Sequence, residues 1–198
     1  YKRSTDKGVS WGADVRLTNN AAVSAIPSVS VSGLFVHVAW DDTRDGNAEI
    51  YYKRSTDGGV SWGADTRLTN NSASSTSACV AVLDSVVHVT WQDRRDEWEI
   101  YYKRSSDGGV SWGPDIRLTS NPASSWYPNV AVSGSVVHLV WQDRMNGNDE
   151  IYYKRSADKG LSWDSVTRLT FNTSGSWNPS VSVSGSVVHV VWNDYRIG

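Results

Sequence analysis

Tryptophan is the residue type in this sequence with the clearest capacity to bind a ligand. The chain contains 11 tryptophans against 2 phenylalanines. Two of them, Trp126 and Trp177, occupy matching loops in which earlier copies carry Ala25 and Thr76. An aromatic plate beside charged groups suits a pyranose ring, which has an apolar C–H face and a polar rim. An interpretation in which both rings only fill the mouth of a channel explains these positions equally well.

Aspartate and arginine also recur together, in short polar hairpins such as Asp143-Arg144. Ion pairs that stabilise the hairpins are the favoured interpretation, because such pairs are common in tight turns. The alternative is a ring of charged groups beside the two tryptophans. On that alternative, the predicted ligand-binding residues are Trp126, Tyr127, Trp177, Asp143, Arg144, Asp194 and Arg196.

The four histidines are weaker candidates for chemistry. His37, His88, His138 and His189 each alternate with valine, and no second ligand lies near them at a metal spacing. We therefore expect structural hydrogen bonds rather than metal ligation. The sequence predicts no metal site, no cofactor and no catalytic residue.

All these residues belong to one repeating unit of about fifty residues. Asp6, Asp57, Asp107 and Asp158 are equivalent and lie 51, 50 and 51 residues apart. The segments 1–18 and 52–69 are identical at 16 of 18 positions. A period of this length indicates a solenoid, a propeller or another repeat architecture.

Each unit is predicted to form four short strands. The first covers Ser28–Ser32 in one copy, the second ends at Trp40, the third reads EIYYKRS, and the fourth surrounds Leu68. Valine, tyrosine, tryptophan and threonine dominate these segments, and glycine, asparagine and aspartate separate them. A repeated four-stranded meander is typical of β-propeller blades, so we predict an all-β propeller of four blades with four antiparallel strands each.

The segment Ser55–Trp62 has the pattern S-x-D-x-G-x-[ST]-W, and residues 4–11, 105–112 and 156–163 repeat it. This pattern resembles the Asp-box, or bacterial neuraminidase repeat, of sialidase-like β-propellers. The resemblance implies a structural turn between the third and fourth strands, on the face opposite a sialidase active site. The predicted structural Asp-box residues are Asp6, Trp11, Asp57, Trp62, Asp107, Trp112, Asp158 and Trp163.

Sialidase catalysis is a separate question from the fold. The resemblance implies that it needs three arginines, a tyrosine–glutamate nucleophile and an aspartate acid/base. The family's arginine motif, Y/F-R-I-P, has one similar string here, Tyr195-Arg196-Ile197-Gly198, which occupies the position of an ordinary repeat hairpin. We therefore predict a binding module without catalytic activity, with a sialidase-like hydrolase as the third possibility.

The four-strand repeat does not start at the first residue of the sequence. The first residues correspond to a third and fourth strand, and the last to a first and second strand. We predict a single domain, 1–198, in which residues 179–198 plus 1–20 form one blade and Tyr1–Thr18 pairs with the strand ending at Trp192. A variant is a dimer in which two chains complete one larger ring.

The composition and charge of the chain limit the kinds of partner that we expect it to bind. The net charge is −2, without the excess of basic residues usual in proteins that bind nucleic acid. No apolar stretch is long enough to span a membrane, and one cysteine cannot form an internal disulfide. The sequence predicts an extracellular or cell-surface module with glycan as its partner. The alternative is a protein-interaction scaffold without a small ligand.

Overall fold

The computed structural model describes residues 1–196. These residues contain no helix, and therefore no helix that could cross a membrane. The strands are β1 (Ser24–Ser32), β2 (Phe35–Asp45), β3 (Asn47–Ser55), β4 (Thr66–Arg67), β5 (Ser75–Leu83), β6 (Val86–Asp93), β7 (Glu99–Ser105), β8 (Ile116–Arg117), β9 (Ser125–Ser133), β10 (Val136–Asp143), β11 (Glu150–Ser156), β12 (Thr167–Arg168), β13 (Ser176–Ser184) and β14 (Val187–Asp194).

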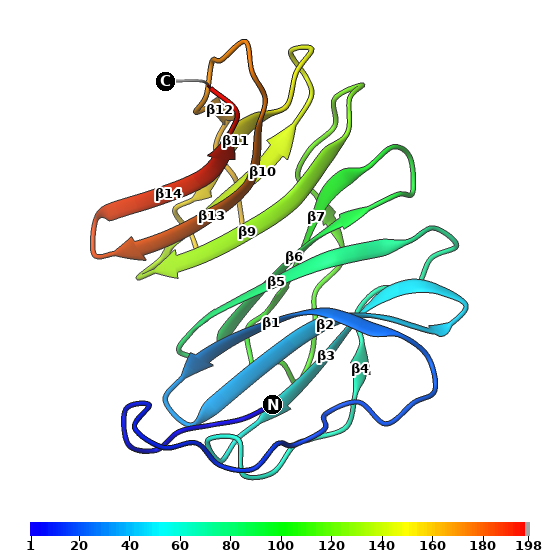
Figure 1. Cartoon of the computed structure of the whole chain (residues 1–198), viewed down its shortest axis with the longest axis vertical. Helices are drawn as coiled ribbons and strands as arrows, with labels where there is room; N and C mark the ends of the chain where they lie inside the picture. Colours follow the sequence, from blue (N-terminus) through cyan, green and yellow to red (C-terminus); the bar gives the residue numbers. More distant parts are fainter. Residues whose placement is uncertain (197–198) are drawn as a thin grey trace.

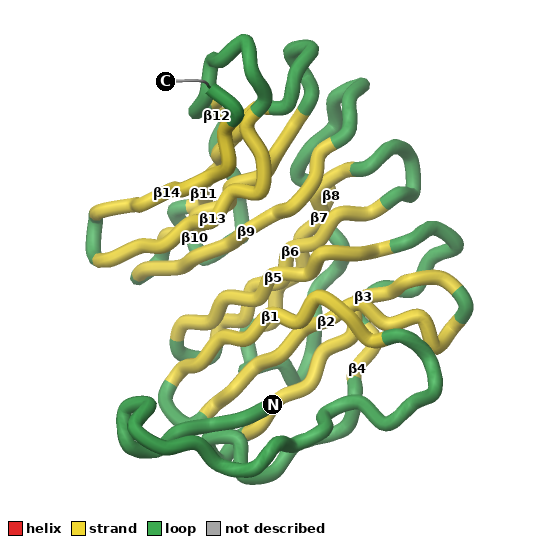
Figure 2. The backbone as a smooth tube through the Cα atoms, in the orientation of Figure 1, coloured by secondary structure: helices red, strands yellow, loops and turns green. Residues whose placement is uncertain are grey.

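These strands form four antiparallel sheets (Figures 1 and 2). Three have the sequential order β1-β2-β3-β4, β5-β6-β7-β8 and β9-β10-β11-β12, and the fourth contains β13 and β14 alone. This confirms the predicted all-β meander. The fourth strand of each complete sheet is shorter than predicted: β4 covers two residues, and beyond it a single backbone bond joins Leu68 to Ile50.

The first strands of successive sheets lie side by side, in the order β1, β5, β9, β13 (Figure 1). Short polar side chains join them. The Val80 amide donates to Ser28 Oγ and the Val82 amide to Ser30 Oγ, both at 3.1 Å. Between β9 and β13, the Val181 amide donates to Asn129 Oδ1 at 2.9 Å. An alternating serine pattern thus satisfies backbone donors of the neighbouring sheet.

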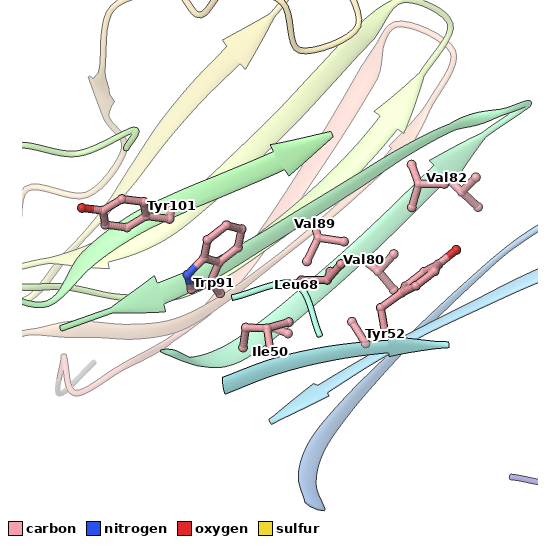
Figure 3. Packing of buried hydrophobic residues seen from close by; sticks show 11 residues of the cluster. Ile50, Tyr52, Leu68, Val80, Val82, Val89, Trp91 and Tyr101 are labelled. Atoms are coloured by element: carbon pink, nitrogen blue, oxygen red, sulfur yellow. The ribbon is translucent and has the colours of Figure 1, made fainter. Parts of the chain in front are cut away.

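The apolar core lies between the sheets. Trp91 of the second sheet packs in one cluster with Ile50 and Leu68 of the first, and Trp91 is fully buried (Figure 3). Trp141 packs in the same way with Ile100 and Leu118. These strand-end tryptophans thus pack between neighbouring sheets, where one indole ring buries a large apolar area.

The buried histidines make structural hydrogen bonds, as predicted. His37 Nδ1 lies 2.6 Å from the hydroxyl oxygen of Tyr52, and His88 Nδ1 lies 2.7 Å from that of Tyr102. His138 makes the same contact with Tyr153 at 2.8 Å. Burial lowers the pKa of His37 and of His88 to about 4, so both rings are neutral near pH 7.

The aspartate turns, which are residues 4–11, 55–62, 105–112 and 156–163, are closed by their own side chains. Asp57 accepts hydrogen bonds from the backbone amides of Val60 and Ser61 and from the hydroxyl of Ser55. Gly59 has a φ of 83°, a conformation that glycine adopts without strain. These contacts give Asp57 a structural role.

In three of the four aspartate turns, the tryptophan that ends the turn packs against a tyrosine of the preceding repeat. The edge-to-face pairs have ring centroids 4.9 to 5.2 Å apart. They are Tyr1–Trp62, Tyr52–Trp112 and Tyr102–Trp163. These three turns are thus fixed to the neighbouring repeat as well as to their own sheets.

The predicted pairing of Tyr1–Thr18 with β14 is not formed in this structure. Residues 1–23 contain no strand, and β14 pairs with β13 alone. The two ends of the chain lie at opposite ends of the array in Figure 1, while the first strands of all four sheets line one common hollow. The assignment of residues 179–198 plus 1–20 to one blade remains a prediction.

Candidate functional site

Loops and turns gather at the two opposite ends of the strands, and these two ends of the molecule differ. At one end, the start of β1 lies beside the end of β2, with Ser24 opposite Asp42. Trp126 and Trp177, predicted in loops, are instead the second residues of β9 and β13, and they lie at the same end as the Asp–Arg hairpins because Trp126 is paired with Gln142 and Trp177 with Asn193. The aspartate turns lie at the other end, where the Gly58 amide donates to Leu34 of the β1–β2 turn at 2.8 Å. This arrangement gathers the predicted ligand-binding residues away from the structural turns.

A groove lies at the hairpin end between the third and fourth sheets. It encloses about 320 Å³, near the lower limit for small-ligand pockets. Its lining residues are Trp126, Tyr127, Gln142, Arg144, Asp149, Trp177 and Asn178. Four of the seven predicted ligand-binding residues are thus brought together.

Asp149 organises the polar side of this groove. Its carboxylate accepts a hydrogen bond from the Trp177 indole Nε1 at 3.0 Å and one from Gln142 at 3.0 Å. It also forms an ion pair with Arg144 at 2.8 Å. Trp177 is therefore held in one orientation by a charge-assisted bond.

The same contacts set the charge of the groove. Desolvation by burial favours protonation of Asp149, but hydrogen bonds from Arg144, Gln142 and Trp177 outweigh it and lower the pKa of this carboxyl. The Arg144 guanidinium and the Asp149 carboxylate are both ionised near neutral pH, so their charges offset one another.

Trp126 and Tyr127 form the opposite side. The Arg144 guanidinium carbon lies 5.5 Å from the centre of the Trp126 ring, within cation–π range. Tyr127 has a φ of 52°, a left-handed conformation that costs energy for a residue with a side chain. A hydrogen bond of 2.9 Å from the Tyr127 amide to Gln92 of the preceding sheet holds this conformation.

Asp143 differs from the prediction. It is fully buried, and its carboxylate accepts hydrogen bonds from the side chains of Asn121, Ser125 and Trp141. It also accepts one from the Met145 amide. All of these partners are internal, so Asp143 positions the hairpin and does not line the groove. An aspartate that recurs in every hairpin reflects this internal network.

Asp194 and Arg196 lie on the far side of Trp177. Asp194 accepts hydrogen bonds from Asn172 and from the Arg196 amide, both at 2.8 Å, and pairs with the Arg196 side chain at 2.9 Å. Tyr195 contacts the Trp177 ring edge-to-face at 4.7 Å. Residues 197 and 198 of the arginine-motif-like string lie outside the described part of the chain.

Sequence reasoning missed Asp149 and Gln142. A signal for Asp149 exists in the repeat: the position before Glu49, Glu99 and Glu150 holds alanine, tryptophan and aspartate respectively. The pairing of Asp149 with Trp177 could not be read from it, because their contact depends on how the third and fourth sheets stack.

Solved structures of other proteins have a similar fold. Trypanosoma rangeli sialidase in complex with 2,3-difluoro-KDN is similar with a TM-score of 0.63 at 16% identity, covering 87% of this chain and 37% of that chain. A Fusarium graminearum GH93 α-L-arabinofuranosidase in complex with arabinobiose has a TM-score of 0.62 at 16% identity, covering 80% and 52%. The sheets are arranged as in glycosidase β-propellers. At this identity the likeness concerns the fold alone.

This chain spans about a third to a half of the length of these neighbours. No protein family and no curated protein matches its sequence.

Proposed function

We propose that this chain is a non-catalytic carbohydrate-binding module, and that its ligand lies in the groove between Trp126 and Trp177. The observation that carries the proposal is the arrangement around Asp149: an ion pair with Arg144 lies between two tryptophans, one of them fixed by the same carboxylate. A sugar ring could stack on an indole while its hydroxyl groups donate to Asp149 and accept from Arg144.

The charge balance favours a neutral glycan. A sugar carboxylate is best bound by arginines whose positive charge is not already offset. Arg144 is half-exposed, but its charge is offset by Asp149 at 2.8 Å. We therefore propose neutral hexopyranosides as ligands, from an extracellular or cell-surface setting where glycans are displayed.

The groove is poorly suited to hydrolysis. Glycosidases commonly use two carboxyl groups across the scissile bond, one of them free to donate a proton. Among the lining residues of this groove, Asp149 is the one carboxylate, and three donors engage it. A fluorogenic sialoside and a fluorogenic arabinofuranoside test the catalytic alternative directly, and turnover of either would contradict the proposal.

The binding test uses intrinsic fluorescence and calorimetry with neutral mono- and oligosaccharides and with sialyllactose. One groove of this size should give a dissociation constant on the order of 1 mM, with avidity from multivalent display. Neutral sugars should bind more tightly than sialyllactose, and Trp177→Ala should weaken binding at least about 10-fold.

Phe35→Ala is the matched aromatic control, because Phe35 is exposed at the other end of the molecule. It should leave the dissociation constant unchanged. If Trp126→Ala and Trp177→Ala, both folded, bind like the unmodified protein, the groove is not the site.

A further inference from the structure

Gly175 lies two residues before Trp177, on the segment that leads into β13. We propose that Gly175 is the positioning residue of the groove: because it has no β-carbon, the Trp177 ring can turn toward Asp149 and present a fixed surface to a sugar. The binding step rests on the proposed function. The orientation of the ring rests on the geometry of this segment alone.

A β-carbon at position 175 would collide with the Trp177 ring. It would lie 2.9 Å from both Cε2 and Cη2 of the indole, and closer still to Cζ2. Carbon atoms in contact lie about 3.5–4.0 Å apart, so the ring would have to move by more than about 0.5 Å. Cε2 is bonded to Nε1, and a rigid indole cannot move one without the other. The hydrogen bond of 3.0 Å from Nε1 to Asp149 would therefore not survive in its present geometry.

The backbone itself does not require glycine at this position. Gly175 does not have a positive φ, in contrast to Gly160 of the preceding aspartate turn, which has a φ of 82°. Alanine or serine is therefore compatible with the backbone conformation. The three atoms nearest to an added β-carbon all belong to Trp177, so the ring is the group that a side chain here would displace.

The other repeats carry a side chain at this position. Val23, Ser74 and Ser124 stand where the fourth repeat has Gly175. Ser124 is the informative counterpart, because Trp126 follows it at the same spacing. Within residues 1–196 the Trp126 indole donates no hydrogen bond to the preceding sheet, and the Arg144 guanidinium carbon of its own sheet lies 5.5 Å from its ring centre.

The preceding sheet supplies a second difference. At the groove, the Ser176 amide donates to the Asp149 carbonyl at 2.8 Å. At the boundary between the second and third sheets, the Ser125 amide donates to the Trp98 carbonyl at 2.7 Å, so the two backbones dock alike. The side chains at these two points are a carboxylate and an indole, and an indole cannot accept a hydrogen bond from a second indole N–H in this way. A glycine and an aspartate together thus distinguish the groove from its counterpart.

The first experiment measures the orientation of Trp177 without sugar. The indole ¹⁵N–¹H resonances are recorded by NMR, and Trp177→Phe identifies the Trp177 peak by its loss. Gly175→Ala should shift this peak and speed the exchange of its proton with solvent, because the charge-assisted bond to Asp149 is lost. An unchanged peak would overturn the positioning role.

Two further variants control this measurement. Ser124→Ala changes the equivalent position of the third repeat without adding a β-carbon, and it should leave the Trp177 peak unchanged. Gly175→Ser introduces the residue that two other repeats carry there, so the fold accepts it, and it should shift the peak as Gly175→Ala does. A shift caused by Ser124→Ala as large as that caused by Gly175→Ala would contradict a local effect of the β-carbon.

The second experiment measures binding of methyl glucoside, methyl galactoside and methyl mannoside by calorimetry. For any of these sugars that the unmodified protein binds, Gly175→Ala should raise the dissociation constant about 5- to 10-fold. In a Trp177→Phe background the same change should have little further effect, because the smaller ring has no Nε1 donor to displace. An equal effect in both backgrounds would indicate a merely structural role for Gly175.

The two experiments separate the two proposals. A Gly175→Ala protein in which the Trp177 peak has moved, but which binds sugar like the unmodified protein, would overturn the link between ring orientation and binding. If the unmodified protein binds no sugar, the proposed function fails, and the NMR peak still decides whether Gly175 positions Trp177.

Discussion

At the scale of single residues, the aspartate turns show how much one side chain can organise. Asp57 accepts from two backbone amides and two serine hydroxyls, and its pKa is lowered chiefly by the hydrogen bonds from Ser61. The counterparts Asp107 and Asp158 repeat this arrangement. The turns therefore stabilise the fold from the end opposite the groove.

Replacing Asp57 by alanine should lower the free energy of unfolding, because the amides of Val60 and Ser61 lose their acceptor. The dissociation constant for sugar should not change. Chemical denaturation and calorimetry measure both quantities. A variant with normal stability and no binding would show that the turns take part in recognition.

The aspartate turns differ at one position, which is lysine in two copies and glycine in the other two. Lys159 and Lys7 each have a φ of 60°, at the position where two other copies have Gly58 and Gly108 with a φ of 69°. A side chain in this left-handed conformation costs roughly 1 kcal/mol. Lys159→Gly should therefore raise the unfolding free energy by up to about 1 kcal/mol. Gly108→Lys is the reverse control and should lower it by a similar amount.

At the scale of strands and sheets, much of the structure follows from the repeat. The strand order and the aspartate turns were predictable because a fifty-residue period with alternating valines allows few architectures, but the fourth sheet contains two strands where four were predicted. The site was predictable only in part. Trp126, Trp177 and Arg144 do converge, but Asp143 is internal and Asp149 was missed. Both errors concern contacts across strands, which a linear pattern does not contain.

Protonation of the buried histidines makes the free energy of unfolding depend on pH. Burial lowers the pKa of His88 from about 6.5 in the unfolded chain to about 4 in the folded chain, so its stabilising effect is complete above pH 6.5 and is lost as pH falls toward 4. Relative to His88→Gln, the unmodified chain should therefore lose on the order of 3 kcal/mol of unfolding free energy as the pH falls from 6.5 to 4.

Asp41 acts in the opposite direction, because burial raises its pKa to about 6 and its protonation favours folding as pH falls. Subtracting the His88→Gln curve from that of the unmodified chain removes this contribution. Denaturant unfolding at pH 4, 5, 6 and 7 provides the data. A difference that is independent of pH would mean that His88 is not titrated by unfolding.

At the scale of the whole molecule, stability should vary along the array. The second and third sheets are covered on both sides, whereas β14 and residues 1–18 are largely exposed. In repeat architectures each unit depends on its neighbours, so the uncovered ends should open first.

Hydrogen exchange tests this gradient. The β14 amides should exchange far faster than those of β6, because β14 is partly exposed and β6 is buried throughout. Equal protection of β6 and β14 would contradict the gradient.

The serine-to-amide bonds between neighbouring first strands also bear on how such a chain can change over generations. Ser28 and Ser30 recognise the backbone of the next repeat and no particular side chain. A side-chain substitution on one side of such a boundary therefore does not require a matching substitution on the other side. A gene encoding this chain can therefore gain or lose one repeat by recombination, because the side chain that accepts from the next repeat's amide is serine at one boundary, cysteine at the second and asparagine at the third. The number of repeats becomes a heritable variable that can change in a single genetic step.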